Sequence, residues 1–118
     1  MLRATVLRRK SDFALIYNKG KSVGERYIVL FFKKNGLPYN RLAFLASKKV
    51  GGSVIRNRAR RLMKESYREI KEDLADGYDI IFIARKTIRD RKKADVLSSM
   101  SAAVRKAGAI AKNKKGPI

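Results

Sequence analysis

An apolar stripe in residues 54–74 predicts the longest helix of the chain. Its members step by three or four residues: Ile55, Ala59, Leu62, Ser66, Ile70 and Leu74. This spacing puts them on one face of an α-helix, which is then the face that is buried. Ser53 is expected to cap the helix N-terminus, because its hydroxyl can accept an unpaired backbone N–H. Gly77 is expected to end the segment.

Three segments rich in β-branched and aromatic residues predict strands. They are residues 26–34, 41–47 and 78–84. In the first, Tyr27, Val29 and Phe31 are expected to share one face of the sheet, because side chains alternate along a strand. The long helix separates the second and third segments, which permits parallel pairing between those two strands.

Two shorter helices complete the expected order of helix, two or three strands, helix, strand and helix. The first covers residues 11–20, with Ser11 or Asp12 as its cap and Gly20 closing it in a left-handed conformation. Phe13 and Tyr17 are four residues apart and therefore share a face of this helix. The last helix follows a basic loop at residues 85–93. Its apolar face consists of Leu97, Met100, Val104 and Ala107.

The size and the apolar content of the chain predict one domain over residues 1–118. A length of 118 residues suits a single domain, and 45% apolar residues are enough to bury a core. Residues 1–10 hold four cations and no acid and are expected to form a basic arm. Residues 111–118 are expected to form a flexible basic tail.

Missing residue types exclude several kinds of chemistry. The sequence has no Cys, and therefore no disulfide, thiolate nucleophile or Cys-based zinc site. It has no His, which removes the commonest general base and metal ligand. No apolar run approaches the roughly 18–20 residues of a membrane span, and the N-terminus lacks the apolar stretch of a signal peptide. We therefore expect a cytoplasmic protein without a membrane segment.

The charge of the chain points to a polyanionic partner. It has 30 Lys and Arg against 10 Asp and Glu, a formal net charge of +20. Nucleic acid would relieve the self-repulsion of such a chain. Residues 48–64 hold seven cations and no acid: Lys48, Lys49, Arg56, Arg58, Arg60, Arg61 and Lys64.

The order of charges along the long helix opposes the helix dipole. Arg residues occupy its first turns, whereas Glu65, Glu69, Glu72 and Asp73 lie towards its end. The N-terminus of a helix is its positive pole, so each exposed cation there costs a few tenths of a kcal/mol up to about 1 kcal/mol. A phosphate backbone reverses the sign, because helix N–H groups, the dipole and Arg side chains then favour the same anion. The pattern therefore favours nucleic-acid binding over a merely solvated basic face.

The same residues resemble a known family. The run SKKVGGSVIRNRARRLMKE resembles the signature of the bacterial ribonuclease P protein subunit, whose central helix bears an Arg-Asn-Arg motif. RRKSDFALIYNKGKSV resembles the N-terminal helix of the family and the stretch after that helix. RYIVLFF, RLAFLASKK and YDIIFIARK resemble its strands, so that the likeness covers about residues 7–110. Ala43 stands where many members carry Gly, which we interpret as a minor packing change.

The resemblance implies both a fold and a function. The fold is α+β, a two-layer α/β sandwich with the order helix-strand-strand-strand-helix-strand-helix. Its strand-helix-strand crossover is expected to be left-handed, against the usual rule. The function is that of a protein subunit that partners ribonuclease P RNA, a catalytic RNA that removes the 5′ leader from precursor tRNA.

The resemblance also implies two binding sites on this RNA-binding domain. The motif residues Arg56, Asn57, Arg58, Arg60 and Arg61 are expected to contact the catalytic RNA, together with Lys48, Lys49 and Lys64. The family pattern places Phe13, Tyr17 and Phe31 in a cleft for the single-stranded leader. Cations close to them in sequence are Lys19, Arg26 and Lys33. Aromatic faces beside cations suit unpaired bases, although each aromatic on its own could be ordinary core.

The chain itself is not expected to be the nuclease. Metal-dependent cleavage needs clustered carboxylates, and Asp76 and Asp79, which flank a turn, are the weak candidates for such a site. We expect no catalytic residue and no metal ligand in the protein, and Mg²⁺ in the RNA–protein enzyme. A ribosomal-type structural RNA-binding protein and a DNA-binding protein remain as alternatives. Binding to structured RNA, precursor tRNA and duplex DNA at matched salt would separate the three.

Overall fold

The computed structural model describes residues 6–108, 110 and 111, which form three helices and a four-stranded sheet. The elements are α1 (Lys10–Lys19), β1 (Lys21–Gly24), β2 (Ile28–Lys34), β3 (Arg41–Leu45), α2 (Ser53–Ile70), β4 (Tyr78–Ala84) and α3 (Lys93–Ala107), with short 3₁₀ turns at Lys71–Asp73 and Lys86–Ile88. This order confirms the prediction. Residues 1–5 of the predicted arm and residues 112–118 of the predicted tail lie outside the described residues.

The sheet has the strand order β1-β2-β4-β3, so β4 lies in its interior. β2 pairs antiparallel with β1 and with β4, whereas β3 pairs parallel with β4 across the connection through α2. The predicted parallel pairing is thereby confirmed. Ile81 of β4 lies opposite Phe31 of β2 on one side and Ala43 of β3 on the other. These residues therefore form one row on one face of the sheet.

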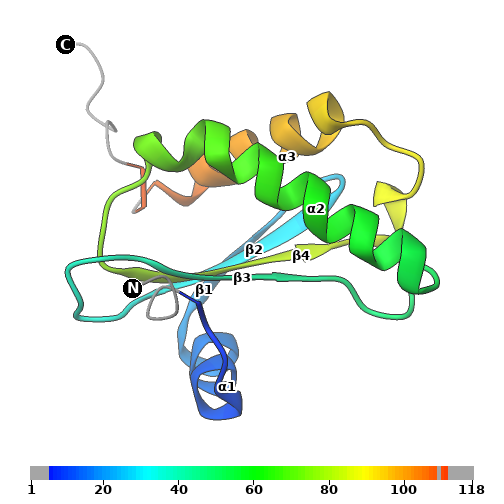
Figure 1. Cartoon of the computed structure of the whole chain (residues 1–118). Coiled ribbons are helices and arrows are strands. Elements are labelled where there is room, and N and C mark those ends of the chain that lie inside the picture. Colours follow the sequence, from blue (N-terminus) through cyan, green and yellow to red (C-terminus); the bar gives the residue numbers. More distant parts are fainter. Residues whose placement is uncertain (1–5, 109, 112–118) are drawn as a thin grey trace, which may run out of the picture.

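The helices lie on both faces of the sheet, as Figure 1 shows: α2 and α3 cover one face and α1 crosses the other. The larger core lies between the sheet and the α2–α3 pair, and Leu30, Phe82, Met63 and Met100 are fully or almost fully buried there. A smaller core under α1 contains Leu7, Ile16, Ala43 and Ile81. Within the described residues, no helix has the length and apolar content to cross a membrane.

The ends of α1 differ from the prediction. The N-cap is Arg9, whose side chain has no acceptor, rather than Ser11 or Asp12. Gly20 follows the helix with φ −84° and is not left-handed. The need for glycine is one of space, because a Cβ there would lie 2.6 Å from the carbonyl oxygens of Ile16 and Phe32. Gly20 therefore lets the end of α1 lie directly against β2.

The ends of α2 also correct the prediction, while its buried face confirms it. Gly52 is the N-cap, Ser53 is the first helical residue, and the α-helix ends at Ile70 instead of reaching Leu74. A 3₁₀ turn follows, and the left-handed Gly77 (φ 94°) belongs to the turn before β4. The stripe residues Ala59, Leu62, Ser66 and Ile70 are all buried. In α3 the buried face contains Val96 and Met100, and Leu97 lies at its margin.

Candidate nucleic-acid interface

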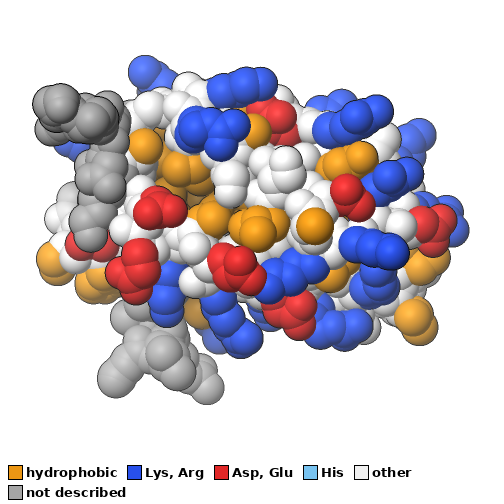
Figure 2. Space-filling view, turned by 90° about the horizontal axis from the view of Figure 1, so that it is seen from above, with side chains coloured by type: hydrophobic (Ala, Val, Ile, Leu, Met, Phe, Trp, Pro, Cys, Tyr) orange, Lys and Arg blue, Asp and Glu red, His pale blue; other side chains and the backbone are white. Residues whose placement is uncertain are grey.

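The solvent face of α2 carries a continuous row of polar and basic side chains. A shallow hollow of about 370 Å³ lies along it, lined by Asn57, Arg60, Arg61, Lys64, Glu65 and Arg68. These positions recur every three or four residues, so they share one face of the helix. We call Arg60, Arg61, Lys64 and Arg68 the basic stripe. Figure 2 shows the α2–α3 side of the molecule, where Lys and Arg side chains spread widely between fewer acidic ones.

The residues of the Arg-Asn-Arg motif have unequal roles in the structure. Arg58 is half-buried and donates a hydrogen bond of 2.9 Å from Nη2 to the carbonyl of Arg91, in the loop before α3. Arg60 donates to the side chain of Asn57. Arg56 is half-buried, and its Nε has no hydrogen-bond partner among the described residues. Arg58 therefore supports the loop, while the exposed Arg61 is available to a ligand.

The loop before α2 presents two further lysines. Val50 is almost fully buried and donates its N–H to the carbonyl of Ser47, which closes a turn. Lys48 and Lys49 are exposed on this turn, close in sequence to the N-terminus of α2. The first turn of α2 contains no acid. The predicted reversal of charge along the helix is thus present in the folded protein.

Phe13, Tyr17 and Phe31 form an aromatic cluster between α1 and the sheet, as predicted. The ring centres of Phe13 and Tyr17 are 6.3 Å apart, and those of Tyr17 and Phe31 are 5.0 Å apart with an edge-to-face angle of 80°. Ile16 and Ile81 are fully buried in the core beneath. Tyr17 is 41% exposed, and burial of the rest of it raises the pKa of its hydroxyl, which stays protonated at neutral pH. The cluster can therefore offer neutral aromatic surface to a planar base.

A second hollow, of about 310 Å³, joins the aromatic cluster to α2. Its lining includes Phe13 of the cluster, Lys64 of the basic stripe and residues 42–45 of β3. Val6 and Leu7 complete it, since the Leu7 N–H donates to the carbonyl of Leu42 along the edge of β3. Both residues belong to the segment that was predicted to be a basic arm. The sequence signal that could have identified Val6 and Leu7 as part of the hollow is that they form an apolar pair inside a basic segment.

The three predicted leader cations lie in two places. Lys19 and Lys33 line a hollow beyond the C-terminal end of α1, together with Lys21 and Lys34. Arg26 precedes the opposite end of β2, and its guanidinium lies 5.8 Å from the ring centre of Tyr27. Arg91 lies 5.4 Å from the same ring centre. The structure therefore groups Lys19 with Lys33 and leaves Arg26 in a separate cluster.

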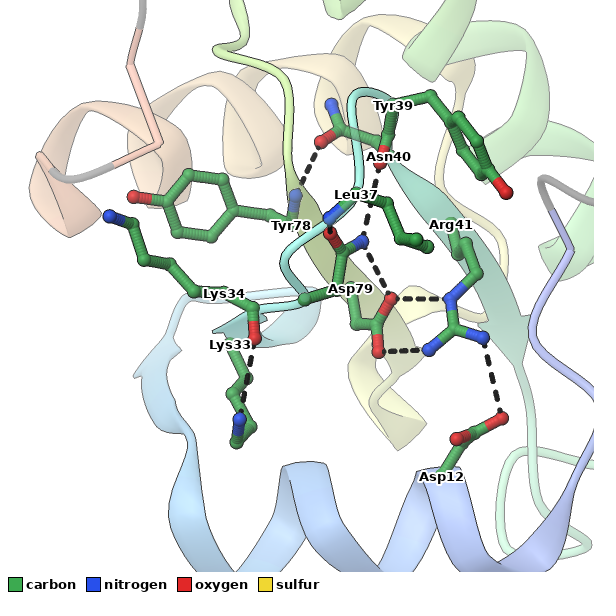
Figure 3. Close-up of polar contacts among 10 residues, drawn as sticks. Asp12, Lys33, Lys34, Leu37, Tyr39, Asn40, Arg41, Tyr78 and Asp79 are labelled. Carbon is green, nitrogen blue, oxygen red and sulfur yellow. Dashed lines mark hydrogen bonds and ion pairs between the residues drawn. The ribbon is translucent and has the colours of Figure 1, made fainter.

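A polar network ties α1 to the edge of the sheet (Figure 3). Arg41 of β3 binds Asp79 of β4 through two hydrogen bonds, from Nε at 2.8 Å and from Nη2 at 2.7 Å. Its third nitrogen lies 3.6 Å from the carboxylate of Asp12 in α1. Asn35 donates a further bond of 3.0 Å to Asp79, which is 6% exposed. The hydrogen bonds that Arg41 donates to Asp79 are the largest cause of the raised pKa of Arg41.

This network engages Asp79, one of the two weak candidates for a metal site. Asp79 is held by a guanidinium and an amide, whereas Asp76 is exposed in the turn before β4. The described residues contain no group of three His, Cys, Asp or Glu that could hold a metal ion. Asp79 thus has a structural role, and Asp76 faces solvent.

A comparison with family models finds a match to ribonuclease P over residues 1–108. Two similar proteins are named ribonuclease P protein component. The one from Clostridium botulinum (strain Langeland) is 44% identical over 108 residues, which are 91% of this chain and 97% of the relative. The one from Clostridioides difficile is 42% identical over 105 residues, or 88% and 92% of the two chains.

Solved structures give the same result. The RNase P protein of Staphylococcus aureus superposes with a TM-score of 0.79 at 31% identity, covering 87% of this chain and 94% of that one. The RNase P protein of Thermotoga maritima superposes with a TM-score of 0.74 at 33% identity, covering 81% and 91%. The likeness therefore extends over almost the whole described fold.

Proposed function

The chain belongs to the ribonuclease P protein family, and from this we propose that it binds ribonuclease P RNA through α2 and the single-stranded 5′ leader of precursor tRNA over the aromatic cluster. The observation that carries the proposal is the hollow shared by Lys64 and Phe13. It makes the basic stripe and the aromatic cluster neighbours. One RNA partner on α2 can therefore deliver a single strand to the aromatic rings.

The basic stripe suits a folded RNA. Its Arg side chains present planar forks of donors that match phosphate oxygens, and they extend from a rigid helix. Lys48 and Lys49 add charge beside the N-terminus of α2, where the dipole also favours an anion. We assign phosphate contacts to the basic stripe, which includes Arg61, to Lys48 and Lys49, and to Arg56. Arg58 contributes by holding the loop at Arg91.

The aromatic cluster suits unpaired nucleotides and distinguishes this proposal from the alternatives. A base in a duplex is already stacked, whereas a leader base is free to stack on Tyr17 or Phe31. A DNA-binding or ribosomal-type function explains the charge of α2 but leaves the exposed aromatic surface unexplained. Mature tRNA has no leader, so these contacts favour precursor over product.

We propose that the chemistry lies in the RNA and that the protein contributes binding. Hydrolysis of a phosphodiester requires a metal-bound nucleophile or a general base, and the sequence contains no His and no Cys. Mg²⁺ is expected to be held by the RNA–protein enzyme rather than by this chain alone. On this proposal the protein works in the cytoplasm.

The general experiment adds the protein to a bacterial ribonuclease P RNA at low Mg²⁺. Restored removal of the leader from precursor tRNA supports the proposal. A protein that folds but binds no such RNA contradicts it, and preferential binding to duplex DNA at the same salt would favour the DNA alternative.

Replacing Asp76 with Asn tests whether the protein holds the catalytic metal. We expect cleavage by the reconstituted enzyme to stay within a few-fold of wild type, because Asp76 is exposed to solvent in the turn before β4. A metal ligand would cost about 10³-fold or more, at roughly 1.4 kcal/mol per decade. Asp79 is not a suitable probe, since its loss would disrupt the Arg41 network.

Replacing Tyr17 with Leu tests the aromatic cluster. Leu keeps apolar bulk but removes the π face, so the enzyme is expected to lose about 1 kcal/mol, or fivefold, in affinity for a precursor with a long leader. A precursor with a one-nucleotide leader serves as the control substrate and should be unaffected. An equal loss for both substrates, or none for either, would show that Tyr17 is ordinary packing.

A further inference from the structure

Four lysines surround a hollow at the C-terminal end of α1. The proposed stacking of leader bases on the aromatic cluster gives this hollow no role. The hollow measures about 250 Å³, and we call it the lysine pocket. It is lined by Lys19, Gly20, Lys21, Phe32, Lys33, Lys34 and Tyr78. It exists because β2 runs two residues further than its partner: β1 begins at Lys21, opposite Phe32, while β2 continues to Lys34. Gly20 brings the end of α1 against β2 at this notch. Its volume is below that of sites for drug-sized ligands and suits a small group.

The charge of the lysines in this pocket is not balanced by the acids that the structure describes. Within the described residues, no carboxylate lies in ion-pair distance of any of the four ammonium groups. Asp79 lies opposite Lys33 in the sheet, but both of its oxygens are bound by Arg41. Lys33 donates instead to the carbonyl of Lys34 at 3.3 Å. The C-terminal end of α1 is the negative pole of the helix and disfavours an anion. The charge of Lys19 alone can offset this pole, so the charges of the other three lysines remain uncompensated.

The pocket lies next to the aromatic cluster along β2. Figure 3 shows Lys33 directed toward the side of the sheet on which α1 lies, and Lys19 at the end of α1 lines the same hollow as Lys33. On β2, Phe31 and Lys33 are successive residues on one face, about 7 Å apart along the strand. The hollow with Lys64 lies on the other side of the cluster, at Phe13. Basic groups therefore flank the aromatic rings on both sides.

We propose that the lysine pocket binds a backbone phosphate of the leader, on the 5′ side of the base stacked on the aromatic cluster. This rests on the function proposed above. The leader joins the tRNA at its 3′ end, where the catalytic RNA cuts it. If that RNA lies on α2, the 3′ end enters at Lys64 and the strand runs over Phe13 and Tyr17 toward Lys33.

The choice of lysine fits a phosphate on a flexible strand. Lysine is a compact charge on a flexible stem with three rotatable donors, whereas arginine offers a rigid fork. A pocket of lysines therefore follows a mobile phosphate without fixing its orientation. It adds affinity that does not depend on leader sequence, and only leaders long enough to pass the aromatic cluster can use it.

The test uses the reconstituted enzyme, precursors with eight-nucleotide leaders and the double variant Lys21→Gln/Lys34→Gln. One leader phosphate at a time is replaced by a neutral methylphosphonate. For the wild-type protein, neutralising one particular linkage is expected to weaken binding several-fold. The same substitution should have a smaller effect on the variant, which has lost two of the four lysines of the pocket. In the variant, the slope of log affinity for precursor against log salt should also fall by about 0.7, the value for one lost phosphate contact.

Four comparisons decide the result. The double variant Lys71→Gln/Arg105→Gln removes two exposed cations outside the pocket and should respond to every methylphosphonate as wild type does. The sensitive linkage should lie on the 5′ side of the nucleotide whose abasic form abolishes the effect of Tyr17→Leu. The pocket is refuted if every linkage responds equally in both proteins, or if the variant weakens binding of the catalytic RNA without precursor. If the enzyme with the wild-type protein shows no preference for precursor over mature tRNA, the proposed function itself is overturned.

Discussion

Replacing Arg41 with Ala is expected to lower the free energy of unfolding by about 3 kcal/mol. The change leaves the carboxylate of Asp79, which is 6% exposed, without its bidentate partner. Breaking a buried ion pair in this way costs about 3–5 kcal/mol, and Arg41 is 24% exposed, which favours the lower end of that range. A domain of this kind is stable by only about 5–15 kcal/mol. Urea unfolding followed by circular dichroism measures the loss.

Two further variants separate the causes of that loss. In Arg41→Ala/Asp79→Asn the unpaired buried charge is gone, so part of the lost stability should return. Asp12→Asn removes the charge of the 3.6 Å contact alone and should cost less than 1 kcal/mol, because that pair is partly exposed. If Arg41→Ala unfolds at the same urea concentration as wild type, the network does not hold α1 and the sheet edge together.

Replacing Arg61, Lys64 and Arg68 with Ala is expected to weaken binding to ribonuclease P RNA by about 10³-fold or more. Hydrogen bonds to charged groups contribute about 1.5 kcal/mol or more each, and these three side chains are exposed on one face of α2. The slope of log affinity against log salt should fall by about 2.1–2.7, or 0.7–0.9 for each lost phosphate contact. The fold should be unaffected, because the buried face of α2 is unchanged.

The controls for this prediction use two other sets of cations. Lys71→Ala/Arg105→Ala should leave both affinity and salt slope near wild type. Arg58→Ala should weaken RNA binding and also lower stability, because Arg58 donates to the carbonyl of Arg91. Arg58 is therefore a poorer probe of phosphate contact than its position in the motif suggests. Intact circular dichroism with unchanged affinity and slope in the triple variant would make the basic stripe a solvated face.

Local periodicity predicted the elements of this fold well. The strand at residues 78–84 has the predicted bounds, and the apolar stripe of α2 is buried from Ala59 to Ile70. These features depend on neighbours within one or two turns or along one strand. The helix caps were wrong, because Arg9 and Gly52 occupy the cap positions and neighbouring Ser and Asp residues lie inside the helices.

Several features that depend on residues far apart in sequence were not predicted. Arg41 and Asp79 are 38 residues apart and meet only because β3 and β4 pair in a particular register. Gly20 was expected to have a left-handed backbone, but its role is to allow close packing against β2. Arg26 was grouped with Phe31 by nearness in sequence, yet an extended strand carries residues five apart to different places.

The position of β4 in the sheet sets the order in which the molecule can assemble during synthesis. β2 and β3 leave the ribosome early, but they are not neighbours, and the strand that joins them follows only after the whole of α2. Until then both strands have open edges, and α1 lacks Ile81 beneath it. A nascent chain that ends before residue 78 already contains Phe13, Tyr17, Phe31 and all of α2. It still cannot hold them in place, so RNA binding and correct folding become available together, when the last strand arrives.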